Sequence, residues 1–316
     1  MSEQIHFEIP DSMAGKRIDQ VLASELGSYS RGRLQTWLRE GVITVDGLVV
    51  EPKKRVSGGE IVAGTLEPAP PPDTVEPENI PLDILFEDDA VLVINKPAGL
   101  VMHIAPGNYT GTLQNALLFH RPDIAAIPRA GIVHRLDKDT SGVLMIAKTL
   151  EAHHLLVQQL QARTVHRIYH AVVIGVPVAG TTIDAPIGRH PVDRKKMAVV
   201  DHGKPAITHF RVAKKFKRHS HVTVKLETGR THQIRVHMAH IRYPLIGDDV
   251  YGGRRQIPAG LGDLAKTAVM KFPRQALHAA ELGIVHPLSG DDMQWSSPLP
   301  DDMQRLLNVL TEDSAA

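Results

Sequence analysis

A proline-rich, acidic segment divides this chain and limits what it can fold into. Between Glu67 and Pro81 the sequence holds six prolines, with four acidic residues among them. Proline lacks a backbone N–H and fixes φ, so this segment cannot form a helix interior or a central strand. Such a composition is typical of an extended, semi-rigid linker. We therefore predict two domains, residues 1–66 and 82–316, joined by a linker over residues 67–81.

Residues 1–66 predict a small α+β module. Apolar residues at helical spacing predict one helix over Asp19–Leu26 and a second over Arg31–Glu40, with Ser30 as the N-cap of the second. The alternating segment Ile43–Val50 contains an Asp-Gly pair, which is a strong hairpin signal. Two helices followed by a hairpin are enough to enclose a small core.

Four basic side chains of this module are candidate contacts for phosphate groups. They are Arg31, Arg33, Lys53 and Lys54. Lysines and arginines on one face can bind a polyanion. Arginines on an exposed helix are more often simply solvated, so the pattern alone leaves both interpretations open.

The segment Gly131–Gly142, here called the first polar cluster, is the strongest candidate for a functional site. It begins with apolar residues, becomes dense in polar groups including His134, Arg135 and Asp137, and is followed by the apolar run Val143–Ala147. This profile predicts two strands joined by a tight polar turn. Turns carried by a rigid sheet are where catalytic groups tend to lie.

Leu226–His237 forms the second polar cluster. Gly229 permits a sharp turn, and apolar spacing predicts a helix from Thr231, so this cluster would be a strand-to-helix junction. Arg230 at such a junction could reach across a cleft to Asp137, hold that carboxylate ionised and fix its orientation. A purely structural buried ion pair would have the same spacing, and spacing alone does not separate the two.

Basic residues concentrate between Pro186 and Arg242. This stretch holds fourteen lysines and arginines against three acidic residues, whereas the whole chain has a net charge of +1. Solvated loops would explain the pattern, but the basic residues share a domain with both polar clusters. We therefore favour a surface that binds a polyanion.

Composition excludes several classes of function. The 316-residue chain has no cysteine, which rules out disulfides and thiolate chemistry and fits the cytoplasm. Met1–Pro10 has no apolar core, so we expect no signal peptide, and no apolar run is long enough to span a membrane. Phosphate-loop and dinucleotide motifs are absent, and the histidines lack metallohydrolase spacing, so we expect neither cofactor nor metal.

Other segments predict ordinary elements of the second domain. They are a strand pair over Ile84–Ile94, helices over Gly111–His120, Leu150–Arg163 and Met303–Leu310, a strand over Arg167–Gly175, and a frayed end over Glu312–Ala316.

The polar clusters and one strand together carry a set of motifs known from one enzyme family. The motifs are His134-Arg135-Leu136-Asp137 followed by Thr140-Ser141-Gly142, Tyr169 two residues after Arg167, and Thr228-Gly229-Arg230-Thr231-His232-Gln233-Ile234-Arg235. They resemble the signatures of RNA pseudouridine synthases, in the branch that modifies large-subunit ribosomal RNA. The helix–helix–hairpin order of residues 1–66 likewise resembles the S4 RNA-binding domain.

The resemblance implies a fold and a set of roles. The fold would be α+β or mixed α/β, with a largely antiparallel central sheet in the catalytic domain behind a small S4-like domain. Asp137 would be the catalytic carboxylate and Arg230 its ionic partner. Tyr169 would stack on the target base and help remove its C5 proton, while Arg135 would fill the space that the base leaves, and His134 would also contact RNA.

The reaction that the resemblance implies converts uridine to pseudouridine. The bond from N1 to the ribose breaks, the uracil turns, and C5 joins the same sugar carbon, so no redox step or external group is needed. The resemblance points to the stem-loop called helix 69 of large-subunit ribosomal RNA, either free or in an assembling subunit. We expect a cytoplasmic monomer that does not bind membranes.

Two other interpretations stay open on the residues alone. Asp137-Lys138-Asp139-Thr140 also matches the pattern of phosphotransferases that form an aspartyl phosphate. Those enzymes need a continuous apolar strand directly before the first aspartate, and here His134 and Arg135 interrupt it. A non-catalytic RNA-binding protein would explain the basic residues but not the two polar clusters.

Overall fold

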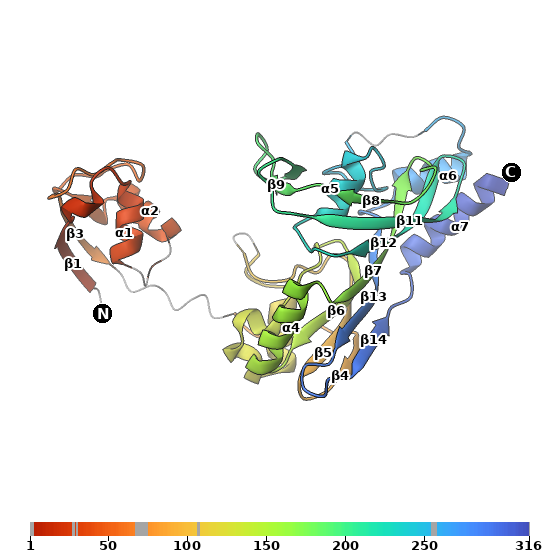
Figure 1. Cartoon of the computed structure of the whole chain (residues 1–316), viewed down its shortest axis with the longest axis horizontal. Coiled ribbons are helices and arrows are strands. Elements are labelled where there is room, and N and C mark those ends of the chain that lie inside the picture. Colours follow the sequence, from red (N-terminus) through yellow and green to blue (C-terminus); the bar gives the residue numbers. More distant parts are fainter. Residues whose placement is uncertain are drawn as a thin grey trace. The chain divides into compact units, whose positions relative to one another are not determined.

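The computed structural model describes residues 3–26, 29, 31–66, 75–105, 108–253 and 258–315. The chain forms two compact units, Met1–Thr74 and Val75–Ala316 (Figure 1). The second half of the expected linker belongs to the larger unit, because the backbone N–H of Glu78 donates to Asn115 O at 3.0 Å. The Glu78 carboxylate also accepts the backbone N–H of Gly111 at 2.9 Å. Residues 67–74 of that linker lie outside the described residues.

The smaller unit is a three-stranded antiparallel sheet packed with two helices. Its strands run in the order β1-β3-β2. The element bounds are β1 (Glu3–Glu8), the 3₁₀ helix η1 (Asp11–Met13), α1 (Ile18–Glu25), α2 (Arg31–Glu40), β2 (Ile43–Val45) and β3 (Ile61–Leu66). Both predicted helices are confirmed, and their buried side chains, Ile18, Val21, Leu22, Leu34 and Leu38 among them, form the core with the sheet.

Two features of this unit differ from the sequence analysis. The predicted strand Ile43–Val50 already ends at Val45, because Asp46 and Gly47 adopt φ values of 52° and 74° and turn the chain. Strand β1 was missed, although Ile5, Phe7 and Ile9 alternate with polar residues as a half-buried strand does. Ser30, the predicted N-cap, lies outside the described residues.

A nine-stranded sheet forms the centre of the larger unit (Figure 1). Its order is β4-β5-β6-β13-β7-β12-β11-β8, and β14 pairs with β13. Only the β13–β6 pairing is parallel, which confirms a largely antiparallel sheet. The strands are β4 (Ile84–Glu87), β5 (Val91–Lys96), β6 (Ser141–Ala147), β7 (His166–Ile174), β8 (Thr181–Asp184), β11 (Ile207–Lys215), β12 (His219–Leu226), β13 (Leu277–Val285) and β14 (Asp292–Ser296); β9 (Ile187–Arg189) and β10 (Met197–Val199) form a separate hairpin.

Helices cover both faces of this sheet. On one face, α3 (Leu113–His120) and α5 (Gln233–His240) contribute to the core that includes the inward side chains of β5, β6, β7 and β12. On the other face lie α4 (Leu150–Ala162), α6 (Asp263–Met270) and α7 (Asp301–Ala315). All seven residues of β6 are buried, as expected of a strand packed on both faces.

Most predicted elements of the larger unit are confirmed, and two are corrected. The first polar cluster does not begin with a strand: two 3₁₀ turns, η2 (Pro122–Ala126) and η3 (Pro128–Gly131), lead into an irregular segment, and Ile132 makes only an isolated bridge to Ile146. Arg129 and Ala130 have positive φ values of 54° and 50°, which turn the chain out of an extended path. Helix α7 also continues to Ala315, so the predicted fraying over Glu312–Ala316 is wrong for Glu312–Ala315.

Candidate active site

Asp137 lies on the irregular segment that enters β6, and several hydrogen bonds fix that segment. Lys96, at the end of β5, is fully buried, and its Nζ donates to Lys138 O at 2.9 Å as well as to Pro97 O and Leu100 O. The Thr140 N–H donates to Asp137 O at 3.0 Å and closes the turn. Loss of solvation lowers the Lys96 pKa to about 8. The lysine therefore acts as a structural anchor beneath the aspartate.

The parallel pairing of β6 with β13 brings the start of β6, just after Asp137, close to the backbone of β13. Gly142 has a φ of 116°, and a Cβ at this position would lie 2.1 Å from Ala279 O. Only glycine permits this approach. On the same pair of strands, Ser141 Oγ lies 3.0 Å from His278 Nδ1, which fixes the register.

Arg235, and not Arg230, holds Asp137. Arg235 Nη1 lies 3.0 Å from Asp137 Oδ2, while its Nε and Nη2 lie 2.7 and 2.9 Å from the two oxygens of Asp248. The Asp248 side chain is fully buried, and its Oδ1 also accepts the backbone N–H groups of Val250 and Tyr251. The two carboxylates raise the Arg235 pKa, and the arginine in turn lowers that of Asp248 despite its burial. This bidentate pair fixes the guanidinium that contacts Asp137.

The predicted Asp137–Arg230 pair is therefore wrong. Arg230 precedes helix α5, and its Nε donates to Pro205 O at 3.0 Å. Gln233 Oε1 accepts the Arg230 backbone N–H and the Thr228 hydroxyl, which closes the turn and directs Arg230 away from the aspartate. Arg235 lies in the first turn of α5 on its buried side.

His232 is the second group near the carboxylate. Its Nε2 lies 3.7 Å from Asp137 Oδ1, and its Nδ1 lies 2.7 Å from the Tyr251 hydroxyl oxygen. That oxygen accepts the Met197 N–H, and its own proton can go to Nδ1. Burial lowers the His232 pKa more than Asp137 raises it, so the ring is neutral at neutral pH. In the tautomer whose Nδ1 accepts the Tyr251 proton, the Nε2–H lies on the side of Asp137.

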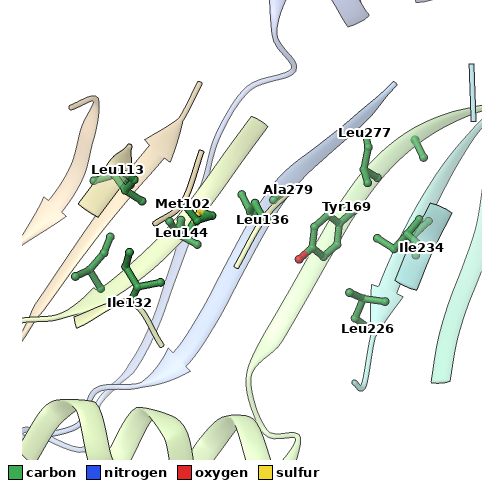
Figure 2. Packing of buried hydrophobic residues seen from close by; sticks show 14 of the residues in the cluster. Met102, Leu113, Ile132, Leu136, Leu144, Tyr169, Leu226, Ile234, Leu277 and Ala279 are labelled. Carbon is green, nitrogen blue, oxygen red and sulfur yellow. The ribbon is translucent and has the colours of Figure 1, made fainter. Parts of the chain in front are cut away.

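Tyr169 lies on β7 with its ring among apolar side chains of the site face. Figure 2 shows the ring near Leu136, Leu226 and Leu277, all members of one buried cluster. The residue is 6% exposed and borders the cavity that also contacts Asp137. Burial raises the Tyr169 pKa, so the phenol is protonated at neutral pH. Tyr169 and Asp137 thus line the same cavity, and that both act in one site stays a prediction.

The cavity between the two polar clusters has a volume of about 560 Å³. That is within the usual range for a small-molecule site. Six arginines line it against two carboxylates, Asp137 and Glu227, so the cavity attracts anions. The arginines are Arg129, Arg135, Arg163, Arg167, Arg230 and Arg235.

The residues predicted to contact RNA lie in two places, at the cavity and on the smaller unit. Arg135 is exposed and lines the cavity. His134 also lines it, but its Nε2 accepts the Met145 N–H at 3.1 Å, and lost solvation together with Arg167 lowers its pKa to about 3. Lys53 and Lys54 are exposed on the smaller unit, whereas the side chains of Arg31 and Arg33 lie outside what the structure describes. Within the described residues no cluster of three or more potential metal ligands occurs.

The fold and this site define a class of RNA-modifying enzyme, and comparison with known proteins identifies it. The sequence model of the RNA pseudouridylate synthase family matches residues 90–240, and that of the S4 domain matches residues 16–62. Among solved structures, human RNA pseudouridylate synthase domain containing 4 aligns with a TM-score of 0.54 at 25% identity, covering 72% of this chain and 93% of that one. The chain belongs to the RNA pseudouridine synthase family.

Its curated relatives carry a narrower description, ribosomal large subunit pseudouridine synthase D. The relative from Pseudomonas aeruginosa is 55% identical over 310 residues, which cover 98% of this chain and 96% of that protein. Those from Xanthomonas campestris and Escherichia coli K12 are 52% and 49% identical, covering 97% and 98% of this chain and 92% and 95% of the relatives.

In the described part of the chain, no helix is both long and apolar enough to cross a bilayer.

Proposed function

We propose that this protein converts uridines of large-subunit ribosomal RNA to pseudouridines, with Asp137 as the reacting group. The observation that carries this proposal is the position of Asp137 in a positively charged cavity, held by Arg235 at 3.0 Å and bordered by Tyr169. The relatives' description supplies the class of RNA. Family membership argues against both a phosphotransferase and a non-catalytic RNA-binding protein, and the irregular segment before Asp137 also lacks the strand that the phosphotransferase requires.

The reaction begins with removal of the target uridine from its stack. Extrusion of a base costs a few kcal/mol, less in a loop than in a helix. Arg135 is exposed at the cavity edge two residues before Asp137, where its guanidinium can fill the vacated space. The ring of Tyr169 then stacks on the uracil, which places the ribose near Asp137.

Asp137 promotes cleavage of the bond between N1 and the ribose, as carboxylates do in glycoside chemistry. The electron pair of that bond leaves with the uracil and returns when C5 forms its bond to the same sugar carbon. The Tyr169 oxygen, in its phenolate form, accepts the C5 proton, and N1 of the uracil takes up one proton from solvent, so that the number of protons is unchanged and the isomerisation is complete. Arg235 and His232 position the carboxylate from two sides.

In this proposal the smaller unit binds RNA and the larger unit carries the active site. Residues 1–66 bind RNA as an S4-like module, with Arg31, Arg33, Lys53 and Lys54 on phosphates, and the catalytic domain is the larger unit, which begins at Val75. We expect the protein to act as a monomer. We place the substrate in the helix 69 stem-loop, free or in an assembling subunit, and hence the protein in the cytoplasm.

The Asp137→Asn variant tests the reacting group. Asparagine keeps the shape and most of the packing, so we expect no detectable pseudouridine while the RNA dissociation constant stays near that of the wild type. Turnover at the wild-type rate would remove Asp137 from its role. Mapping pseudouridines in ribosomal RNA from a deletion strain, complemented with either form, identifies the uridines modified.

A further inference from the structure

Arg167 is a buried cation that the mechanism above does not use. It is 5% exposed and lines the active-site cavity from β7. Its Nη2 donates to Glu227 O at 3.2 Å, while its Nε has no hydrogen-bond partner among the described residues. Within the same part of the chain no carboxylate pairs with it. A buried charge without a counter-ion is costly, so this guanidinium is poised for a ligand oxygen.

The position of Arg167 places that oxygen beside the target base. Residues two apart on a strand face the same side, so Arg167 and Tyr169 both point from β7 toward the cavity. Gly229 lies over the guanidinium, where a Cβ would come within 2.9 Å of Nη1. The bare backbone there leaves room for the arginine beneath the second polar cluster. The positive charge of Arg167 acts on two other groups that line the cavity. It lowers the pKa of His134, and it lowers the pKa of Tyr169, which burial raises.

The other arginines of the cavity are suited to different tasks. Arg235 is neutralised by Asp137 and Asp248. Arg129, Arg135 and Arg163 are exposed, and Arg163 also pairs with Glu227 at 3.4 Å. Arg230 is half-buried and donates to Pro205 O. Arg167 combines burial with an unneutralised charge, which suits a group that develops negative charge inside the cavity.

We propose that Arg167 binds the uracil of the extruded uridine, donating a hydrogen bond to one of its carbonyl oxygens while the ring is detached from the ribose. This inference rests on the proposed function. When the N1 bond breaks, the electron pair stays on the uracil and spreads to O2 and O4. The guanidinium stabilises that anion and keeps it in the cavity until C5 bonds to the ribose and the C5 proton is lost.

Substitution of Arg167 tests the proposal in single-turnover reactions with a target-containing RNA oligonucleotide. Removal of one preorganised donor to a developing oxyanion typically costs about 10²–10³-fold in rate. We expect Arg167→Met to show that loss with an unchanged RNA dissociation constant, and Arg167→Lys to recover part of the rate. The lysine variant should melt like the wild type, so a slow reaction there is not a failure to fold.

Atom substitutions in the RNA identify the contact. Target uridines carrying sulfur at position 2 or 4 weaken one acceptor each. At the contacted position the sulfur should slow the wild type but add little to the defect of Arg167→Met, which has no donor there, and its effect on Arg167→Lys should lie between the two. If each thio substitution slows all three proteins by the same factor, Arg167 does not bind the base and the inference is wrong.

A phosphate contact would have a different signature. Loss of one phosphate contact reduces the slope of log affinity against log salt by about 0.7 for single-stranded RNA. We expect Arg167→Met to leave that slope unchanged and Arg163→Met, at the cavity edge, to reduce it. A reduced slope for Arg167→Met would overturn the inference. If Asp137→Asn is inactive while Arg167→Met reacts at the wild-type rate, only the inference fails; if the wild type forms no pseudouridine, the proposed function fails.

Discussion

Arg235 Nη1 lies 3.0 Å from Asp137 Oδ2, so helix α5 and the segment before β6, far apart in sequence, are joined at one carboxylate. The same guanidinium binds Asp248 through two further hydrogen bonds. Arg235 thus partly neutralises both Asp137 and Asp248. It also fixes the orientation of Asp137, the carboxylate that faces the cavity.

We expect Arg235→Met to cost both activity and stability, because it leaves buried Asp248 without its partner. Removal of one partner of a buried ion pair lowers the free energy of unfolding by about 3–5 kcal/mol. Activity should fall by about 10²-fold or more through misplacement of Asp137. The double variant Arg235→Met/Asp248→Asn, which removes the unpaired charge and keeps the acceptor for Val250 and Tyr251, should regain part of the stability but not the activity, as measured by urea denaturation and single-turnover assays.

Arg230→Met is the matched control for this prediction. Arg230 lines the same cavity but donates to a backbone carbonyl and not to Asp137. We expect a smaller loss of activity and little loss of stability. Equal defects in Arg230→Met and Arg235→Met would mean that the observed pair does not position Asp137.

The pH dependence of the reaction should report on Tyr169. Burial raises its pKa, and Asp137 raises it further while Arg167 lowers it. A phenol accepts a proton only after losing its own, so its base form becomes more populated as pH rises toward that pKa. When C5 deprotonation limits the rate, we expect single-turnover rates to increase from pH 7 to pH 9.

The Tyr169→Phe variant provides the control. It retains Lys96, the other nearby group that titrates in this range with a pKa of about 8. We expect Tyr169→Phe to bind RNA normally, to react about 10²–10⁴-fold more slowly and to lose the pH dependence. A variant as fast as the wild type, or one that keeps the same rise with pH, would exclude the hydroxyl from proton transfer.

The sequence located the active site but did not identify all of its contacts. Asp137 and Tyr169 were predictable because they belong to short local motifs, and the structure brings both to one cavity. The partner of Asp137 was not predictable from spacing, since Arg230 and Arg235 lie in the same polar cluster. The choice depends on where α5 begins and on how Gln233 closes the turn before it.

Long-range contacts explain the other omissions. Asp248 matters only because a loop after α5 returns to Arg235, and no local pattern marks that return. The strand expected before Asp137 is absent because Arg129 and Ala130 adopt positive φ, which their residue types do not indicate. Periodicity was sufficient for α2, α4 and β7, whose buried faces repeat regularly along the sequence.

Deletion of Met1–Thr74 should leave a folded larger unit that retains isomerase activity but discriminates less among RNAs. The division falls between Thr74 and Val75, and the hydrogen bonds of Glu78 lie within the larger unit. Selectivity is measured as the reaction rate on the target stem-loop divided by the rate on an unrelated hairpin. This ratio is compared between the full-length protein and the truncated one. An unchanged ratio would mean that the S4-like unit does not contribute to substrate choice.

Acid should destabilise the larger unit through four histidines that have lost solvation on folding. Lost solvation lowers the pKa of His134 to about 3 and those of His219, His221 and His278 to about 4. The unfolded chain binds protons at these rings below about pH 6.5, whereas the folded chain does not until well below that pH. Each group therefore contributes stability above about pH 6.5 that is lost as pH falls toward its folded pKa, by up to about 1.4 kcal/mol per pH unit.

Replacement of one such histidine isolates the effect. His219 is fully buried, and neither ring nitrogen has a hydrogen-bond partner among the described residues, so His219→Leu removes a titrating group without breaking a bond. We expect its urea midpoint to fall less steeply than that of the wild type between pH 6.5 and pH 4. His202→Gln, at an exposed position, should match the wild type. Parallel slopes for all three proteins would show that His219 can take up a proton in the folded state, contrary to its burial.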